Sequence, residues 1–459
     1  MKTKPALSYF SLLFLGTILL TVGSPSEAQP ASQQPTGLEV DPLASNEVVA
    51  TLEGETRPRI PLAFPATSLA PGMSSRGEQA ARELESTLRS DLDATRIFDI
   101  QGPEALAVLK LSGDSSRDLE QYRSLGNDIL LLTDVRDTEN KVIFEGRLLD
   151  LKNGDSILGK RYQGTFDIAR SIAHTFSDEV MLYLGGRRGI ARTSIAFTSD
   201  RTGHKEIYLM DYDGHGQRQV TAHKSISMAP TWSGDSSNLA YLSFLKGPPS
   251  LLRVDLSTGK KNTLVSDGKH NLSPSYSPDN RSLAFAKSLD GNTEIFAARS
   301  GGSQERRLTH SRSIETNPAW SPTGQGIAFT SSRTGNPNIF IMDPDGANIR
   351  RISFDGTYND GAAWHPEGSR IAYSSRRGGV FQIVVTDIVT LETTVLTKGS
   401  RNKEGPTFSP DGERIAFSSQ GREGSQIYVV DLEGRVLAQL THQGNNSSPS
   451  WSPYPAKNR

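Results

Sequence analysis

The sequence predicts two folded parts, a small N-terminal α/β domain followed by an all-β six-bladed β-propeller. The propeller is indicated by a repeated apolar–alanine–aromatic triplet whose start numbers rise by 44 each time. An aromatic residue recurs in step with it, and a period in the forties with several short strands per unit is typical of propeller blades. The triplets are Ile195-Ala196-Phe197, Leu239-Ala240-Tyr241, Leu283-Ala284-Phe285, Ile327-Ala328-Phe329, Ile371-Ala372-Tyr373 and Ile415-Ala416-Phe417, and the aromatic residues are Trp232, Tyr276, Trp320, Trp364, Phe408 and Trp451.

Each repeat unit carries signals for four short strands. The first ends at the aromatic residue, as in Pro318-Ala319-Trp320, and the second contains the triplet. A turn such as Ser409-Pro410-Asp411-Gly412 joins them, because proline presets φ at the second turn position and glycine relaxes the fourth. Asp345-Gly346 and similar pairs then turn the third strand into the fourth. We expect the alanine of each triplet to let the neighbouring blade approach closely.

The two ends of the repeat array predict how the ring closes. No Pro-x-aromatic strand precedes Ile195, and a first strand without followers, Pro449-Ser450-Trp451, ends the array. We expect these two segments to complete one blade together, because this leaves no unpaired sheet edge at the junction. The propeller is expected over residues 190–455.

The first residues are typical of a secretory signal peptide over residues 1–28. Lys2 and Lys4 precede an apolar run over residues 7–22, and Ser26-Glu27-Ala28 offers small residues for cleavage. The run is shorter than the roughly 20 unbroken apolar residues of a membrane helix. We therefore expect cleavage near Ala28, export to the periplasm, and no membrane span in the mature chain.

The region before the propeller divides into a flexible arm and the α/β domain. The arm is expected over residues 29–58, of which residues 29–46 are polar, contain three prolines and carry too few apolar residues to fold alone. The α/β domain is expected over residues 59–186. Its elements, from apolar spacing and turn signals, are a strand at Ile60–Phe64, a helix through Ala80, Leu84, Leu88 and Leu92, a buried strand at Ile129–Val135, a hairpin of Val142–Leu151 and Ser156–Tyr162 around Asn153-Gly154, and a helix through Ile168, Ile172, Phe176 and Val180.

Charge and composition exclude several function classes. The 50 Lys and Arg residues balance 51 Asp and Glu residues, so the net charge of −1 gives no reason to expect a nucleic-acid partner. The chain has no cysteine, its eight histidines are scattered, and it lacks the Gly-x-Ser-x-Gly, His-Glu-x-x-His and phosphate-loop motifs. Asp211–Gly214 and Asp343–Gly346 are interpreted as hairpin turns, since no distal glutamate completes a calcium loop. We expect no catalytic residue, no cofactor, no metal site and a monomer.

Strand alternation identifies one propeller face as the expected docking face for a partner. Second-to-third and fourth-to-first connections must emerge on the same face, and they carry Arg201, Arg333, Arg376 and His223. This face is polar, somewhat basic and rich in hydrogen-bond donors; the alternative is that these are ordinary solvated loops. An enzyme in the channel would need paired carboxylates or a metal cluster there, whereas we expect the mid-blade positions to be apolar.

The chain resembles the TolB family, the periplasmic proteins of the Tol–Pal envelope system. The resemblance rests on the signal peptide, the small α/β domain, Arg57-Pro58, the Arg192–Phe197 segment that opens six repeat units, and the Trp451-Ser452-Pro453-Tyr454 ending. It implies that the propeller binds the peptidoglycan-associated lipoprotein Pal and that the N-terminal arm contacts TolA. It also implies a role in maintaining the outer membrane and in its constriction at cell division.

The resemblance further implies individual binding residues. His270, Ser273 and Thr316 match the family's Pal-binding loops and are expected on fourth-to-first connections. The TolA-binding segment falls at Glu47–Pro58, a shortened match behind a long arm. Its expected contact residues are Glu47, Val48, Leu52 and Glu53.

Two function classes follow from these observations. The first is a periplasmic protein–protein scaffold of the Tol–Pal system. The alternative is an exported propeller hydrolase or lyase, which turnover assays on peptides and glycans would distinguish.

Overall fold

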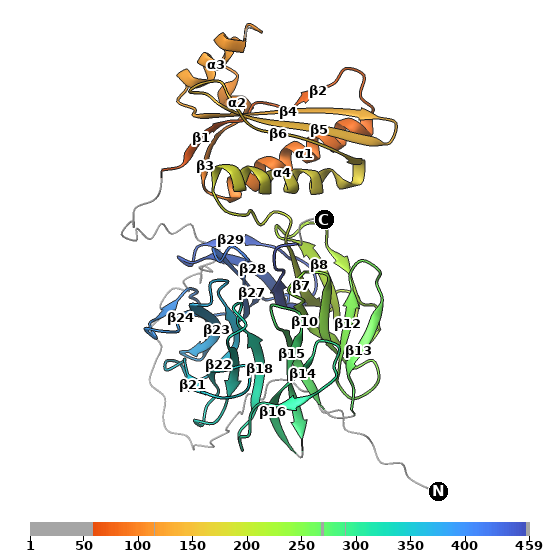
Figure 1. Cartoon of the computed structure of the whole chain (residues 1–459), viewed down its shortest axis with the longest axis vertical. Helices are drawn as coiled ribbons and strands as arrows, with labels where there is room; N and C mark the ends of the chain where they lie inside the picture. Colours follow the sequence, from red (N-terminus) through yellow and green to blue (C-terminus); the bar gives the residue numbers. More distant parts are fainter. Residues whose placement is uncertain (1–57, 114, 268–269, 290, 456–459) are drawn as a thin grey trace, which may run out of the picture. The chain divides into compact units, whose positions relative to one another are not determined.

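The computed structural model describes residues 58–113, 115–267, 270–289 and 291–455, and all of these fall in one compact unit (Figure 1). The expected signal peptide and, apart from Pro58, the expected arm lie outside the described residues. The fold class that the sequence predicts is confirmed: an N-terminal α/β domain precedes a six-bladed β-propeller.

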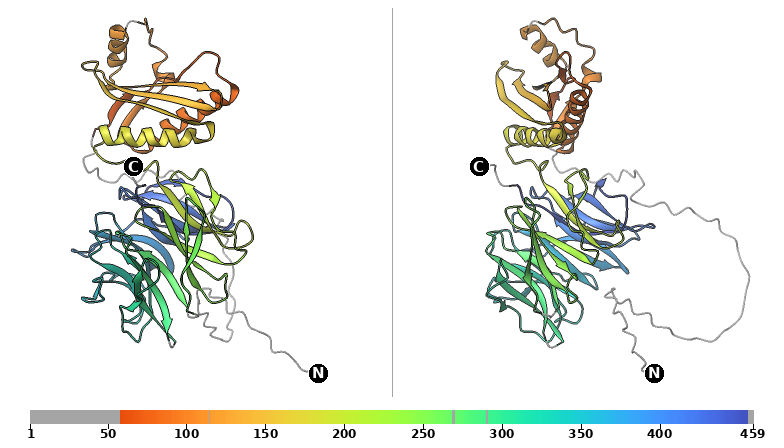
Figure 2. Two further views of the ribbon diagram at one scale, coloured as in Figure 1. Left: turned by 45° about the vertical axis from the view of Figure 1, so that its right-hand side comes forward. Right: turned by 90° about the vertical axis from the view of Figure 1, so that its right-hand side faces the viewer.

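The α/β domain is built on a six-stranded mixed sheet in the order β3-β1-β4-β5-β6, with β2 paired to β4 (Figures 1 and 2). The first three strands of this order run parallel, and β4, β5 and β6 form an antiparallel meander. The strands are β1 (Ile60–Ala63), β2 (Ser68–Leu69), β3 (Phe98–Gln101), β4 (Ile129–Thr138), β5 (Lys141–Asp150) and β6 (Ser156–Thr165). The β5–β6 hairpin turns where the sequence predicts, with Gly154 at a φ of 78°.

Two long helices, α1 (Ser75–Ala94) and α4 (Ala169–Leu184), cover one face of the sheet (Figures 1 and 2). The hydroxyl of Ser74 caps α1 by accepting the N–H of Gly77 at 3.1 Å. A 3-10 turn, η1 (Phe166–Ile168), precedes α4, so Ile168 belongs to the turn rather than to the helix. Two short helices, α2 (Pro103–Leu106) and α3 (Ser115–Ser124), contribute to a second, smaller core.

The propeller consists of six four-stranded antiparallel sheets whose first strands contact one another around the axis. From the first strand outward, they are blade 1, β10 (Ser227–Trp232), β11 (Asn238–Ser243), β12 (Ser250–Asp255) and β13 (Lys261–Val265); blade 2, β14 (Asn271–Tyr276), β15 (Ser282–Leu289), β16 (Asn292–Arg299) and β17 (Arg306–Arg307); blade 3, β18 (Glu315–Trp320), β19 (Ile327–Ser331), β20 (Asn338–Met342) and β21 (Arg350–Arg351); blade 4, β22 (Asn359–Trp364), β23 (Arg370–Arg377), β24 (Val380–Asp387) and β25 (Thr393–Val395); blade 5, β26 (Lys403–Phe408), β27 (Arg414–Gln420), β28 (Ser425–Asp431) and β29 (Val436–Gln439); and the closing blade, β30 (Asn446–Trp451), β7 (Ser194–Ser199), β8 (Glu206–Asp211) and β9 (Arg218–Gln219).

The inner strands are longer than the sequence analysis expected, because each begins three residues before the Pro-x-aromatic position. The extra residues pair with the second strand through a β-bulge in every blade. The third residue of each inner strand takes a left-handed φ between 48° and 71°; these residues are Ala229, Ser273, Asn317, Gly361, Gly405 and Ser448. A bulge bends the strand and locally disrupts the ladder. The alanines of the six triplets are all fully buried, as expected for positions that face the next blade.

The ring closes as the two ends of the repeat array predict. Strand β30 pairs with β7, which places Trp451 opposite Ile195 and Ser450 opposite Ala196. Trp451 is 5 % exposed, and its indole N–H donates to the Thr193 hydroxyl at 2.9 Å. One blade is therefore assembled from residues more than 200 positions apart in the chain.

Replacing Trp451 by alanine should lower the free energy of unfolding by about 3–5 kcal/mol, because it empties a buried aromatic site. Deleting the chain from Ser448 onward should lower it further, because the deletion also unpairs β7. Chemical denaturation monitored by circular dichroism measures both. An unfolding midpoint that the deletion leaves unchanged would contradict this account of closure.

Candidate partner-binding face

The antiparallel blades give the propeller two different faces. We call the one with the second-to-third and fourth-to-first connections the loop face, and the one with the other connections the turn face. Contacts between the two kinds of loop confirm the first definition, since the Asn445 N–H donates to Asp200 at 2.7 Å. The α/β domain contacts the turn face, for example where Arg96 pairs with Asp431 at 2.8 Å. The loop face is thus the face that the α/β domain leaves free.

Of the three residues that the resemblance assigns to Pal, one lies in a loop and two lie in inner strands. His270 is exposed in the β13–β14 connection, as expected. Ser273 and Thr316 are half-buried in β14 and β18, so their expected loop positions are wrong. The reason is the early start of the inner strands. Ser273 donates to the side-chain oxygen of Asn317 at 2.5 Å, which links two neighbouring blades on the channel wall.

Two of the arginines assigned to the docking face are held within their own blades. The Arg333 guanidinium lies 5.5 and 5.0 Å from the ring centres of Phe329 and Phe340. It also donates to Glu315, whose side chain is fully buried, at 3.1 Å. Arg201 is held in the same way over two aromatic rings of the closing blade. Both guanidinium groups are therefore already engaged by side chains of their own blades, so they are less available to bind a partner.

The remaining two residues of the expected face, Arg376 and His223, differ in solvent exposure and in their contacts. Arg376, at the end of β23, is exposed and donates to the main-chain carbonyl of Gly379 at 3.2 Å. His223 is half-buried, lies 3.2 Å from the Ser227 hydroxyl and packs against the ring of Tyr241. Burial lowers the pKa of His223, so its neutral form is favoured.

The channel wall is more polar than the sequence analysis expected. Asp360 in β22 accepts from Asn317 at 2.6 Å, from the Thr330 hydroxyl at 2.7 Å and from the next main-chain N–H at 2.8 Å. Burial raises the pKa of Glu404 in β26, and the charge of Asp360 raises it further. Two neighbouring inner strands thus present a carboxylate pair, which corrects the expectation of apolar positions there. The two hydrogen bonds from Asn317 and Thr330 of blade 3 hold Asp360 as a bridge between blades.

Exposed apolar side chains stand beside the polar residues of the loop face. Ile314 and Phe354, in the two fourth-to-first loops that flank blade 3, are each 58 % exposed. Ile226 and Leu245, near blade 1, are 42 % and 45 % exposed. Exposed apolar patches mark protein-binding surfaces, and these four side chains are the candidates for one on the loop face.

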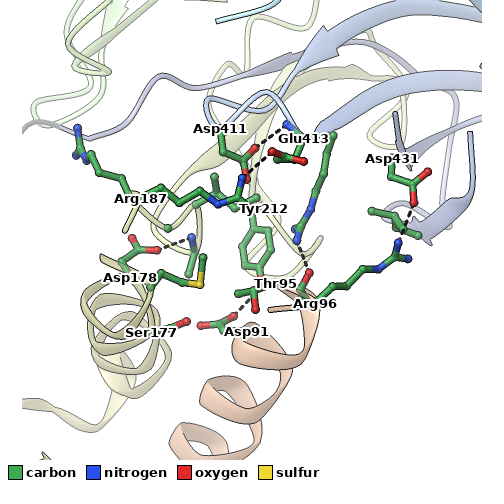
Figure 3. Close-up of a pocket in the computed structure, with 18 of the residues that line it drawn as sticks. Asp91, Thr95, Arg96, Ser177, Asp178, Arg187, Tyr212, Asp411, Glu413 and Asp431 are labelled. Atoms are coloured by element: carbon green, nitrogen blue, oxygen red, sulfur yellow. Dashed lines mark hydrogen bonds and ion pairs between the residues drawn. The ribbon is translucent and has the colours of Figure 1, made fainter. Parts of the chain in front are cut away.

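The junction of the α/β domain with the turn face encloses a pocket of about 240 Å³ (Figure 3). Arg96 pairs with Asp431 at 2.8 Å, and Arg187 pairs with Glu413 at 2.6 Å. Arg414 donates to a main-chain carbonyl at the end of α1. Cationic and anionic side chains both line the pocket and pair with one another, so it selects neither an anion nor a cation. These pairs join the two domains.

Beside this pocket lies a buried charge cluster that the sequence search did not find. Asp91, His174 and Asp213 bring potential metal-ligand atoms within 4.8 Å of one another. Those atoms already have partners: the His174 Nδ1 lies 2.7 Å from Asp91, and Arg170 donates to Asp213 at 2.6 Å. Tyr212 donates to the second oxygen of Asp91 at 2.9 Å. Because Arg170 supplies the positive charge, we assign the cluster as an ion-pair network and not as a metal site.

Comparison with known proteins identifies the family. The profile of the family described as "TolB beta propeller domain" matches residues 182–455, more than half of the chain. The chain belongs to the TolB family. A solved structure titled as TolB from Acinetobacter baumannii has the same fold, with a TM-score of 0.73 over 86 % of this chain and 97 % of that one, at 23 % identity.

Curated TolB proteins resemble part of this chain. "Protein TolB homolog" of Chlorobium chlorochromatii is 33 % identical over 189 residues, 41 % of this chain and 43 % of that protein. "Tol-Pal system protein TolB" of Geobacter metallireducens is 39 % identical over 155 residues, 34 % of this chain and 36 % of that protein. The matched stretch spans less than half the length of these relatives. The chain is thus a homologue of TolB proteins of the Tol–Pal system.

For this TolB homologue, the described residues contain no helix long and apolar enough to cross a membrane. The residues assigned to TolA binding, Glu47, Val48, Leu52 and Glu53, lie outside the described residues.

Two features of the TolB channel and rim escaped the sequence analysis. The carboxylates Asp360 and Glu404 stand four residues before the repeated aromatic, a position that an alignment of the six repeats against each other would have marked. Ile314 and Phe354 carried no such signal, because apolar residues in loops are common and only exposure distinguishes them.

Replacing Arg333 by alanine should lower the free energy of unfolding by up to about 3 kcal/mol, because Glu315 would be left buried without its cation. We take the lower end of the range for broken buried pairs since Arg333 is itself 25 % exposed. Arg376→Ala, the matched control on the same face, should change stability by less than about 0.5 kcal/mol. Equal losses for the two variants in urea denaturation would contradict the structural role of Arg333.

Proposed function

We propose that this TolB homologue is a periplasmic scaffold of the Tol–Pal system that binds Pal on the loop face of its propeller. In this role it maintains the outer membrane and supports its constriction at cell division. The mature protein is exported by a signal peptide cleaved near Ala28, has no catalytic activity and acts as a monomer. Its similarity to Tol–Pal system proteins supports the Tol–Pal assignment.

The observation that carries this proposal is that the two faces of the propeller have different contacts. The α/β domain contacts the turn face, whereas the loop face presents His270, Ile314 and Phe354 to solvent. Exposed apolar and aromatic side chains beside hydrogen-bonding groups are the usual composition of a binding hot spot. His270 and Thr316 stand on adjacent blades near the channel mouth, so one partner segment that enters the channel can reach both.

Substitutions on the loop face should weaken binding of Pal from the same organism. His270→Ala and Thr316→Ala should each cost about 1–3 kcal/mol, since a desolvated partner group would be left unpaired. Phe354→Ala should cost more than 1 kcal/mol by removing an apolar anchor. A loss of 1.4 kcal/mol corresponds to tenfold in Kd, which calorimetric titration resolves.

The matched controls lie on the turn face. Val389→Ala removes an apolar side chain that is 82 % exposed, and Asp411→Ala removes a carboxylate in a first-to-second turn. Both should leave the affinity for Pal unchanged. If they weaken binding as much as the loop-face variants, the docking face is wrong. If no variant has an effect, the residue assignments fall while the family assignment stands.

We further propose that the arm binds TolA through Glu47, Val48, Leu52 and Glu53. The support is the position of this segment directly before the α/β domain and its match to the family. A protein that begins at Arg57 should lose binding to TolA in a pull-down but keep its affinity for Pal. Retention of TolA by this shortened protein would overturn the arm proposal alone.

A further inference from the structure

The geometry between α4 and β8 points to a proton-controlled latch that holds the α/β domain against the propeller. We propose that charged His174 bonds across the junction to Asp211 and that neutral His174 bonds to Arg170 on its own helix. The latch is a property of the domain junction and is independent of Pal binding.

His174 lies within reach of both Arg170 and Asp211. Its Nε2 atom lies 3.4 Å from an Arg170 nitrogen and 3.9 Å from a carboxylate oxygen of Asp211. A neutral ring that donates from Nδ1 to Asp91 has only a lone pair at Nε2, so it accepts from Arg170. A charged ring carries a hydrogen at Nε2, so it is repelled by Arg170 and attracted by Asp211. Because Arg170 and His174 are both in α4, only the charged form adds a bond between domains.

The groups that face His174 together favour its charged form, although Arg170 opposes it. They are Asp91 from α1, Arg170 from α4, Asp211 from β8, and Tyr212 and Asp213 from the following turn, with His215 paired to Asp213 at 3.2 Å. Burial alone lowers the pKa of His174, and Arg170 lowers it further. The hydrogen bond and charge of Asp91, together with the charge of Asp213, outweigh both, so the pKa is raised.

The sign of the pH response follows from this direction. The pKa of His174 is raised in the folded state. The stabilisation from the latch is therefore fully present below the ordinary histidine pKa of about 6.5 and is lost as the pH rises through the raised value. Burial also raises the pKa of Asp211, so acidification removes the other charge of the pair at a less acidic pH than for an ordinary carboxyl group. A pocket of about 310 Å³ lined by His174 and Asp211 gives solvent protons access.

The direct test is an NMR titration of histidine ring signals in the full mature chain. The pKa of His174 should lie above about 6.5 and should fall by about 1–3 pH units in Asp91→Asn, because burial then acts without the nearest carboxylate. Tyr212→Phe, which keeps the Asp91 charge, should leave it raised. A pKa of His174 at or below the ordinary value, or one that Asp91→Asn leaves unchanged, overturns the proposal.

The consequence for the domains is measured by the distance distribution between two spin labels. The natural chain has no cysteine, so Val108→Cys and Val389→Cys, at positions 70 % and 82 % exposed, provide one label in each domain. The distribution should be broader near about pH 9 than near about pH 6, although the Arg96–Asp431 and Arg187–Glu413 pairs still join the domains at both pH values. His174→Gln and Asp211→Asn should both be broad at about pH 6, whereas His204→Asn, an exposed histidine on the loop face, should behave like the parent.

Three results would overturn the latch. The first is an equal width at both pH values, and the second is a pH response that survives in both latch variants. The third is a narrow state that disappears on addition of EDTA, which would assign the cluster to a metal ion instead of a proton.

Discussion

The pairing of β30 with β7 is the constraint on which the rest of the molecule depends. It completes the closing blade and so makes a closed ring from six sheets. Without it, β7 would expose an unpaired strand edge. It also fixes the linker from the α/β domain, because Trp451 bonds to Thr193, the Ser452 N–H bonds to the Ser194 carbonyl, and Tyr454 bonds to the Arg188 carbonyl. The strand that closes the ring therefore also anchors the α/β domain.

This anchoring explains why the two faces of the propeller differ. The linker enters at the start of β7, so the α/β domain meets the turns of the closing blade and of blade 5. There Asp213 pairs with Arg170 of α4, and Asp431 pairs with Arg96 in the turn after α1. Antiparallel strands send the remaining connections to the opposite face, where Ile314 and Phe354 stay exposed. Topology alone thus separates the surface that joins the domains from the surface that is available to a partner.

The features that the sequence predicted are those that local pattern determines. The 44-residue period, the turn dipeptides and the orphan strand at Trp451 led to the blades and to their closure. The roles of single side chains could be assigned only from the structure. The sequence placed Arg333 among the hydrogen-bond donors of the docking face, whereas the structure shows that it pairs with the buried Glu315. The junction was harder still, since His174 and Tyr212 meet Asp91 from 83 and 121 residues away, a separation that leaves no periodic signal.

The pKa values of three histidines in this protein are shifted in opposite directions, and their partners decide the sign. His223 and His365 hydrogen-bond to a serine hydroxyl and to a guanidinium, and burial lowers the pKa of both. Their blades therefore gain stability as the pH rises through the ordinary histidine range. His174 contacts a buried carboxylate and its pKa is raised, so its contribution to stability falls only as the pH rises above the ordinary histidine value, where His223 and His365 are already neutral. Because His223 and His365 lie in connections of the propeller and His174 lies at the domain junction, a rise in pH that weakens the junction does not weaken the other two sites.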